Sequence, residues 1–113
     1  MKLWVDDVRP APEGYVWCKS VCSAKRSIEA RELLDGITWT YDNGTTELLY
    51  PFELIDIDHD AGEYAKDGGD YIKLLDWLEE TGRHYPIRIH SMNPVGRENM
   101  RAIIRRNGWT EVF

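Results

Sequence analysis

The sequence has no long hydrophobic run and little cysteine. No apolar stretch approaches the roughly 20 residues that span a bilayer, and the N-terminus lacks the apolar segment of a signal peptide. We therefore expect a cytoplasmic protein with no membrane partner. Cys18 and Cys22 have no second pair of Cys or His residues nearby. This pattern argues against a zinc site and favours two buried free thiols in a reducing compartment.

Internal repeats, low-complexity tracts and linkers are also absent. The 113 residues are enough for one hydrophobic core but not for two. Hydrophobic residues make up 42% and charged residues 30%, as is ordinary for a soluble globular protein. We expect a single domain over residues 1–113.

Charge is unevenly distributed along the chain. Residues 1–82 have a balance of −10 and residues 83–113 a balance of +4, within a net charge of −6. In one interpretation the acidic part holds a metal and the basic part an anionic substrate. In the other, the two parts neutralise each other across the fold. Composition alone leaves both open.

Strand and helix patterns alternate along the chain. Short apolar runs bounded by turn residues indicate strands, and apolar residues at helical spacing indicate helices. Asp70 and Asn93 are the expected N-caps of two helices, and Pro94 takes the favoured first helical position after Asn93. The expected strands are 2–5, 15–18, 53–58, 86–90 and 109–113, and the expected helices are 23–35, 70–81 and 94–106.

This element order predicts an α/β fold, a three-layer sandwich with a mostly parallel sheet. The near-continuous apolar strand at 53–58 is expected at its centre, covered on both faces. The link between residues 6 and 15 is too short for a helical crossover. The Asn43-Gly44 pair predicts a β-hairpin inserted at 37–51.

Polar residues follow three of the predicted strands. They are Asp6 and Asp7 after the first, Asp58, His59 and Asp60 after the central strand, and His90, Ser91 and Asn93 after the next. Because ligands bind beyond the carboxyl ends of parallel strands, we expect these groups to converge. Two carboxylates about 4 Å apart repel by about 4 kcal/mol at an effective dielectric constant of about 20. A hard divalent cation such as Mg²⁺ or Mn²⁺ relieves this repulsion.

The same region has the groups needed to bind and open a phosphate ester. The helix expected at 94–106 offers backbone N–H groups and the positive end of its dipole beside Ser91. Arg97, in its first turn, is placed to bind the same anion. His59 and His90 close two neighbouring strands, and histidine can move protons near neutral pH.

Each of these residues also has a structural interpretation. Asp6 and Asp7 fit a polar turn in which Asp7 pairs with Arg9, and Asp60 fits a cap of the following loop. Ser91 and Asn93 fit helix caps, and both histidines fit ordinary hydrogen-bonded side chains. These alternatives stay open at the level of the sequence.

Other conspicuous residues are expected outside the site. Asp56, within the central strand, is expected to face a helix N-terminus or an arginine. The arginines at 97, 101 and 105 form a stripe that is typical of a solvated helix face, with RNA contact as the alternative. Of the tryptophans, those at 4, 17 and 77 are expected in the core and Trp39 on the surface.

The constellation resembles a two-component receiver domain. That fold has a pair of acids after its first strand, a phosphate-accepting Asp after the third and a Ser or Thr after the fourth. Asp6-Asp7, Asp58 and Ser91 match these positions. The lysine that receivers keep after the fifth strand has no counterpart here.

Four segments resemble a narrower family, the cyclic-phosphate-processing receiver-like domains. They are LWVDDVRPAPEGYVWCKS, DIDHDAG, DGGDYIKLLDWLEE and IRIHSMNPVGRENM, and they leave 37–51 uncovered. The resemblance implies a receiver-like, flavodoxin-like fold and the processing of cyclic phosphate ends of RNA or of nucleotides. The family's proposed working residues fall on Asp6, Asp7, Arg9, Asp58, His59, Asp60, His90, Ser91, Asn93 and Arg97.

The residues and the resemblance together predict a metal-assisted phosphoesterase for cyclic phosphates of RNA ends or nucleotides. Asp6, Asp7, Asp58 and Asp60 are the expected ligands of Mg²⁺ or Mn²⁺; Asp58, His59 and His90 are the expected catalytic residues; Arg9, Ser91, Asn93 and Arg97 are the expected phosphate-binding residues. An aspartyl-phosphate at Asp58 is the mechanistic variant.

Two further function classes remain. One is a non-catalytic receiver-like module that binds or signals by sensing a phosphate or a cyclic nucleotide, and the other is a protein-interaction domain that uses the hairpin. No reader of duplex DNA is expected, and the sequence leaves the oligomeric state open.

Overall fold

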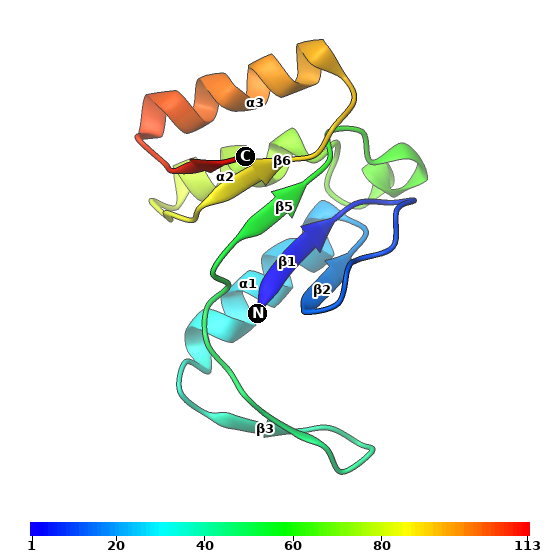
Figure 1. Cartoon of the computed structure of the whole chain (residues 1–113), viewed down its shortest axis with the longest axis vertical. Helices are drawn as coiled ribbons and strands as arrows, with labels where there is room; N and C mark the ends of the chain where they lie inside the picture. Colours follow the sequence, from blue (N-terminus) through cyan, green and yellow to red (C-terminus); the bar gives the residue numbers. More distant parts are fainter.

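Five parallel strands form the main sheet of the protein, which we describe from a computed structural model covering residues 1–113. They lie in the order β2-β1-β5-β6-β7 (Figure 1). Their bounds are Lys2–Val5 (β1), Tyr15–Cys18 (β2), Ile55–Ile57 (β5), Ile87–Ile89 (β6) and Glu111–Val112 (β7). This is the strand order of flavodoxin-like sheets. The predicted receiver-like α/β fold is therefore confirmed.

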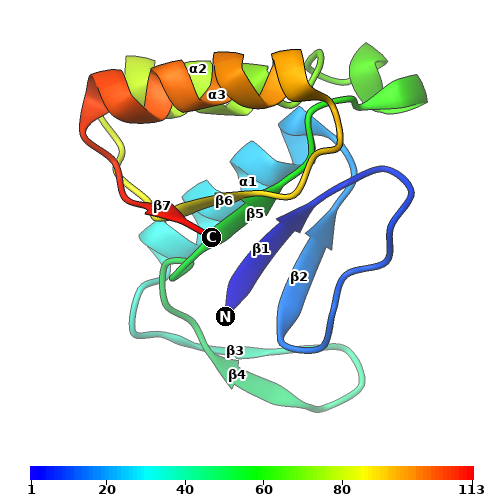
Figure 2. The same cartoon turned by 45° about the horizontal axis from the view of Figure 1, so that its top comes forward.

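Three α-helices, a short 3₁₀ helix and a separate hairpin complete the chain. The helices are α1 (Val21–Leu33), α2 (Ile72–Glu80) and α3 (Pro94–Asn107), with the 3₁₀ helix η1 at Gly62–Lys66; the hairpin strands are β3 (Thr38–Thr40) and β4 (Thr46–Leu48). The hairpin turns at Asn43 and Gly44 as predicted, and Gly44 has a φ of 84° that suits glycine. In both overall views the hairpin lies beyond the end of the sheet where β1 begins (Figures 1 and 2).

All three α-helices cover one face of the sheet. The connections from β2 to β5, β5 to β6 and β6 to β7 step in the same direction across the sheet, and right-handed crossovers then place their helices on the same side. The helices accordingly pack in the row α1-α2-α3. The link from β1 to β2, which steps the other way, contains no helix. Figure 2 shows β1 and β2 with no helix in front of them.

The layer arrangement therefore differs from the sequence-based expectation. We expected three layers and a central strand covered on both faces, whereas the helices cover β5 on one face only. The reason is the short link at residues 6–14, which is the connection that would carry a helix across the second face.

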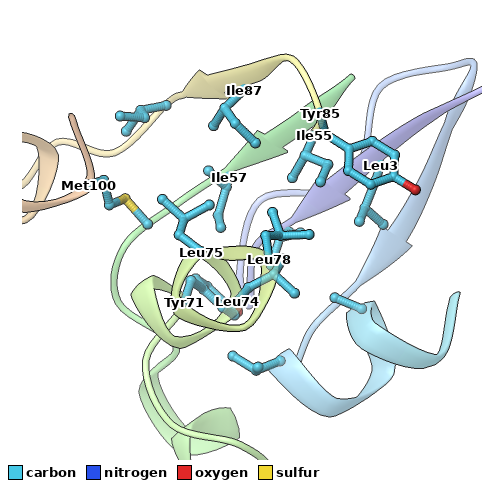
Figure 3. Packing of buried hydrophobic residues seen from close by; sticks show 14 of the residues in the cluster. Leu3, Ile55, Ile57, Tyr71, Leu74, Leu75, Leu78, Tyr85, Ile87 and Met100 are labelled. Carbon is cyan, nitrogen blue, oxygen red and sulfur yellow. The ribbon is translucent and has the colours of Figure 1, made fainter. Parts of the chain in front are cut away.

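The hydrophobic core lies between the sheet and the helices. Leu3, Ile55, Ile57 and Ile87 point from the strands toward a row of buried side chains on α2 (Figure 3). That row consists of Tyr71, Leu74, Leu75 and Leu78, with Met100 of α3 beside it. Because strand side chains alternate between the two faces, the residues between these core positions point to the helix-free face.

The helix starts agree only partly with the predicted caps. Helix α3 begins as expected, with the Asn93 side chain accepting a hydrogen bond from the Gly96 amide at 3.0 Å. Helix α1 begins earlier than expected, because Ser20 forms a capping box with Ser23. Asp70 does not cap α2; its carboxylate accepts a hydrogen bond from the Ala61 amide at 3.1 Å.

The tryptophans and cysteines test the predicted core. Trp39 on the hairpin is exposed, as predicted. Trp17 is 36% exposed, so its assignment to the core was wrong. Both cysteines are free; Cys18 is buried, and Cys22 is only partly so. No helix has the length and apolar character needed to cross a membrane.

Candidate functional site

Three side chains meet where three neighbouring strands end. Asp6 follows β1, Asp58 follows β5 and His90 follows β6, and these strands are adjacent in the sheet. One potential ligand atom from each side chain lies within 4.8 Å of the other two. The predicted convergence of these polar strand ends is therefore present in the fold, at the edge where open α/β sheets bind their ligands.

His90 lies between two carboxylates. Its Nε2 is 2.8 Å from Oδ2 of Asp6, and its Nδ1 is 2.6 Å from Oδ1 of Asp56. The ring stacks on the indole of Trp4, with centroids 4.0 Å apart and planes 4° from parallel. Both carboxylates accept hydrogen bonds, so the ring satisfies both when each nitrogen carries a proton. The position and orientation of this imidazole are thus fixed on three sides.

Asp56 is a site residue that the sequence analysis placed outside the site. Its side chain is fully buried and, besides His90, has Arg88 Nη1 and the Tyr15 hydroxyl each 3.4 Å from its Oδ2. The expected arginine is present, but the shortest contact is with His90. The alternation of side chains along β5 and β6 indicates that Asp56 and His90 share a face. Asp56 pairs with Arg88 in the sheet register, and His90 lies two residues further on the same face.

Asp6 is held as an anion despite its burial. Burial raises the pKa of this carboxyl, but hydrogen bonds from the amides of Val8 and Arg9, together with His90, outweigh that effect. The pKa of Asp6 therefore lies below its ordinary value. The predicted polar turn is also present, because Oδ1 accepts both amides at 2.9 and 3.0 Å. Oδ2 remains directed at His90.

Two of the expected metal ligands lie outside this cluster. The Asp7 side chain points toward Gly62. A Cβ built on that glycine would lie 2.6 Å from Asp7 Oδ2. Asp60 is exposed and pairs with the neighbouring His59, with Oδ1 and Nδ1 2.9 Å apart. The group of potential ligands within 4.8 Å contains Asp6, Asp58 and His90 only.

His59 packs against the first turn of α3. Its ring is so close to Gly96 that a Cβ on that residue would clash with the ring carbons and lie 2.8 Å from Nδ1. Because Asp60 occupies Nδ1, the other ring nitrogen, Nε2, is left to act on a ligand. Both histidines singled out by the sequence are therefore paired with a carboxylate through Nδ1.

The expected phosphate-binding residues occupy different parts of this edge. Arg9 donates from Nη1 to the His90 carbonyl at 3.2 Å, so it reaches from the β1 end to the β6 end. Ser91 is buried and accepts a hydrogen bond from the Asn93 amide at 3.1 Å. The cap made by Asn93 confirms the structural interpretation of that residue, whereas Ser91 does not cap the helix. The hydroxyl proton of Ser91 and the NH₂ group of Asn93 remain donors.

Arg97 has a buried donor without an acceptor. Its Nε is buried and has no hydrogen-bond partner. The side chain lines a pocket of about 280 Å³ together with Met92, Pro94, Glu98 and Arg101. A buried unpartnered donor is costly in a folded protein.

Comparisons with known proteins agree with this geometry. No curated protein and no solved structure matches the chain. A family model described as the cyclic-phosphate processing receiver domain matches residues 1–106, which includes every strand-end residue of the site. The chain therefore belongs to the family of cyclic-phosphate processing receiver domains.

Proposed function

We propose that the protein is a metal-assisted phosphoesterase that opens cyclic phosphates of RNA ends or of nucleotides. The observation that carries this proposal is the convergence of Asp6, Asp58 and His90 at the carboxyl ends of three adjacent strands. Family membership supports a substrate with a cyclic phosphate. The phosphoesterase activity, the metal and the role of each residue are our proposals.

Asp6 and Asp58 would hold the divalent ion. One oxygen of Asp6 accepts two backbone amides, and Oδ1 of Asp58 accepts the His59 amide at 2.8 Å. The second oxygen of Asp58 remains for a ligand, whereas Oδ2 of Asp6 accepts from His90 and has one further lone pair to offer. Oxygen donors suit Mg²⁺ or Mn²⁺. When bound, such an ion would offset negative charge on the phosphate and favour ionisation of a water molecule. Asp7 and Asp60 are the nearest acids along the chain for further coordination.

The two histidines would move the protons. Opening a cyclic phosphodiester requires a base for the attacking water and an acid for the leaving oxygen. His59 suits the base, because Asp60 occupies Nδ1 and Nε2 is left to accept. His90 suits the acid, because Asp56 holds Nδ1 and the Nε2 proton is directed to the cluster. A buried carboxylate behind an imidazole fixes its orientation and stabilises its protonated form.

Two arginines and two polar side chains at the start of α3 would bind the phosphate. Arg9 lies against the His90 carbonyl, and Arg97 has an unpartnered Nε. Guanidinium groups bind phosphate oxygens bidentately. Ser91 and Asn93 would add their remaining donors at the start of α3, where the helix dipole favours an anion.

Turnover of defined cyclic phosphates tests the proposal. The purified protein is incubated with 2′,3′-cyclic nucleotides, RNA ending in a cyclic phosphate and cyclic dinucleotides, each with Mn²⁺, Mg²⁺ or EDTA. We expect metal-dependent hydrolysis that falls about 100-fold or more in Asp58→Asn and in His90→Ala. His84→Ala is the matched control, because His84 is exposed and lies outside the cluster.

The other outcomes separate the remaining function classes. Metal binding that depends on Asp58, without turnover of any substrate, would reject the enzyme and favour a sensing module. A stable phosphate on Asp58 after treatment with acetyl phosphate would favour receiver-like signalling or the covalent mechanism. Turnover that is unchanged in His90→Ala would remove this residue from the mechanism.

A further inference from the structure

The helix-free face of the sheet is continuous with the site. Side chains alternate along each strand, so Asp6, Asp58 and His90 extend the rows that point to this face. The same face carries Trp4 of β1 and Trp17 of β2. In Figure 2 no helix lies in front of β1 and β2. A ligand held at the strand ends can therefore continue onto this surface.

A row of aromatic rings leads from the edge of the sheet to His90. Trp17 is 36% exposed, and its Nε1 donates to the Asp6 carbonyl at 2.7 Å. Tyr15 lies edge-on to Trp4, with ring centroids 5.7 Å apart, and Trp4 stacks on His90. Trp4 itself is buried, and its indole N–H donates to the Arg9 carbonyl at 2.8 Å. Trp17, the exposed ring of the row, is therefore hydrogen-bonded directly to Asp6 of the candidate site.

Away from the acids at the strand ends, the exposed charged groups on this face are mainly positive, in a chain whose net charge is −6. Lys19 Nζ lies 4.5 Å from the centre of the Trp17 ring, and Lys2 Nζ lies 5.6 Å from that of Tyr15. The Arg88 side chain is 48% exposed, whereas its partner Asp56 is fully buried. Glu13, in the link at 6–14, is an exposed acid.

We propose that this helix-free face binds the single-stranded RNA that precedes a terminal cyclic phosphate. This inference rests on the proposed function, and it assigns the substrate class as an RNA end rather than a free nucleotide. A 2′,3′-cyclic phosphate requires a 2′-oxygen, so a nucleic acid that carries one is RNA. Bases in a duplex have their faces covered, whereas unpaired bases can stack on aromatic side chains.

The chemistry of the face favours this ligand over a protein partner. Its rings are interspersed with cations and do not form one continuous apolar patch, which suits a polyanion with flat bases. A base that stacks on Trp17 takes the position of Lys19, whose flexible side chain then reaches the adjoining phosphate. Lys2 and Arg88 provide further positive charge along the face.

Binding in EDTA tests the surface separately from turnover. The probe is a labelled single-stranded RNA of about ten nucleotides that ends in a 3′-phosphate, a length within the site size of known single-strand binders. Its affinity is measured by fluorescence anisotropy over a range of salt concentrations and compared with that of the same RNA in a duplex. We expect tighter binding of the single strand.

Matched variants locate the binding surface. In the double variant Lys2→Ala, Lys19→Ala we expect the slope of log affinity against log salt to fall by about 1.4, about 0.7 for each lost phosphate contact. Lys66→Ala with Lys73→Ala removes the same charge elsewhere and should leave the slope unchanged. Trp17→Leu should weaken binding about tenfold. Trp39→Leu removes the exposed hairpin indole and should bind RNA like the original protein.

Each result supports or overturns the inference. Equal affinity for single strand and duplex would overturn it, as would lysine variants that behave like their controls. Turnover of an RNA that ends in a 2′,3′-cyclic phosphate and of a 2′,3′-cyclic mononucleotide is measured in parallel, with Mn²⁺ or Mg²⁺. Turnover without RNA binding would overturn the RNA surface and keep the proposed enzyme. RNA binding at this face without turnover would keep the surface and reject the enzyme.

Discussion

At the scale of single residues, the site depends on how His90 is held. Three groups fix its ring, because carboxylates occupy both nitrogens and Trp4 covers one side. Two of these three, Trp4 and Asp56, come from the helix-free face rather than from the strand ends. The candidate site at the strand ends and this face are therefore connected by direct side-chain contacts.

Asp56→Asn tests the positioning role of this carboxylate. Asparagine keeps the shape but loses the charge that stabilises a protonated His90. Loss of such a supporting partner typically reduces activity by 10–100-fold, so we expect a decrease of about that size. The control Asp35→Asn changes an exposed acid after α1 and should leave the rate unaltered.

A second residue-scale prediction concerns the buried guanidinium under the hairpin. Glu47 of β4 accepts hydrogen bonds from Arg31 at 3.1 and 3.3 Å and from the Tyr41 hydroxyl at 2.6 Å. The Tyr41 hydrogen bond lowers the Glu47 pKa most, and Arg31 lowers it further, against the opposing effect of burial. We expect Glu47→Gln to reduce the free energy of unfolding by about 1–2 kcal/mol at pH 7, since it leaves Arg31 unpaired.

The pH dependence of this difference has a definite sign. A carboxyl whose folded pKa is lowered stabilises the fold above its unfolded pKa, which for Glu47 is near 4.5. The stabilisation disappears as the pH falls through the lower folded value. Urea unfolding of both proteins from pH 7 downward should therefore show the difference shrinking below about 4.5. A difference that stayed constant into strong acid would show that the Glu47 charge is not its cause.

At the scale of elements, α3 closely approaches the residues that follow β5. Gly96 allows the first turn of α3 to lie directly on the His59 ring. The helix thus carries Arg97, a proposed phosphate-binding residue, and also limits the position of His59, a proposed proton carrier. A glycine inside a helix lowers helix stability by about 1 kcal/mol relative to alanine. At position 96 this loss accompanies the close packing against His59.

Gly96→Ala should not stabilise the protein as a glycine-to-alanine change within a helix usually does. In an unobstructed helix it would stabilise the protein by about 1 kcal/mol. Here the new Cβ meets His59, so we expect no gain in the free energy of unfolding. A displaced His59 ring should lower turnover about tenfold or more. Asn99→Ala, on the exposed side of the same helix, should instead stabilise slightly and preserve turnover.

The elements also show what local sequence can and cannot reveal. The Asn93-Pro94 start of α3 and the Asn43-Gly44 turn were predicted correctly, because a cap or tight turn is determined by adjacent residues. The role of Asp70 was not, because its acceptor contact with Ala61 depends on how the η1 loop folds back. Asp56 was placed outside the site for a related reason. Its contact with His90 depends on the pairing of β5 with β6 in the assembled sheet.

At the scale of the whole molecule, the uneven charge is largely neutralised within the fold. Arg83 pairs with Glu32, Arg88 with Asp56, and Arg106 with Glu79, so arginines of the basic segment reach acids of the acidic one. Arg101 is occupied by Glu98 and Glu111. The expected arginine stripe on α3 is thus broken at its centre. Of the two interpretations of the charge pattern, mutual neutralisation accounts for most of these side chains.

The acids at the strand ends are the exception to this neutralisation, and metal binding should therefore stabilise the whole fold. An ion that binds only the folded state at about 100 times its dissociation constant adds about 2.7 kcal/mol. For a domain of this size we expect Tm to rise by about 10 °C with Mn²⁺. Asp58→Asn should lose the rise, whereas Asp35→Asn should keep it. If EDTA and Mn²⁺ gave the same Tm in the original protein, Asp6 and Asp58 would not form a metal site, and their hydrogen bonds alone would have to stabilise the two carboxylates.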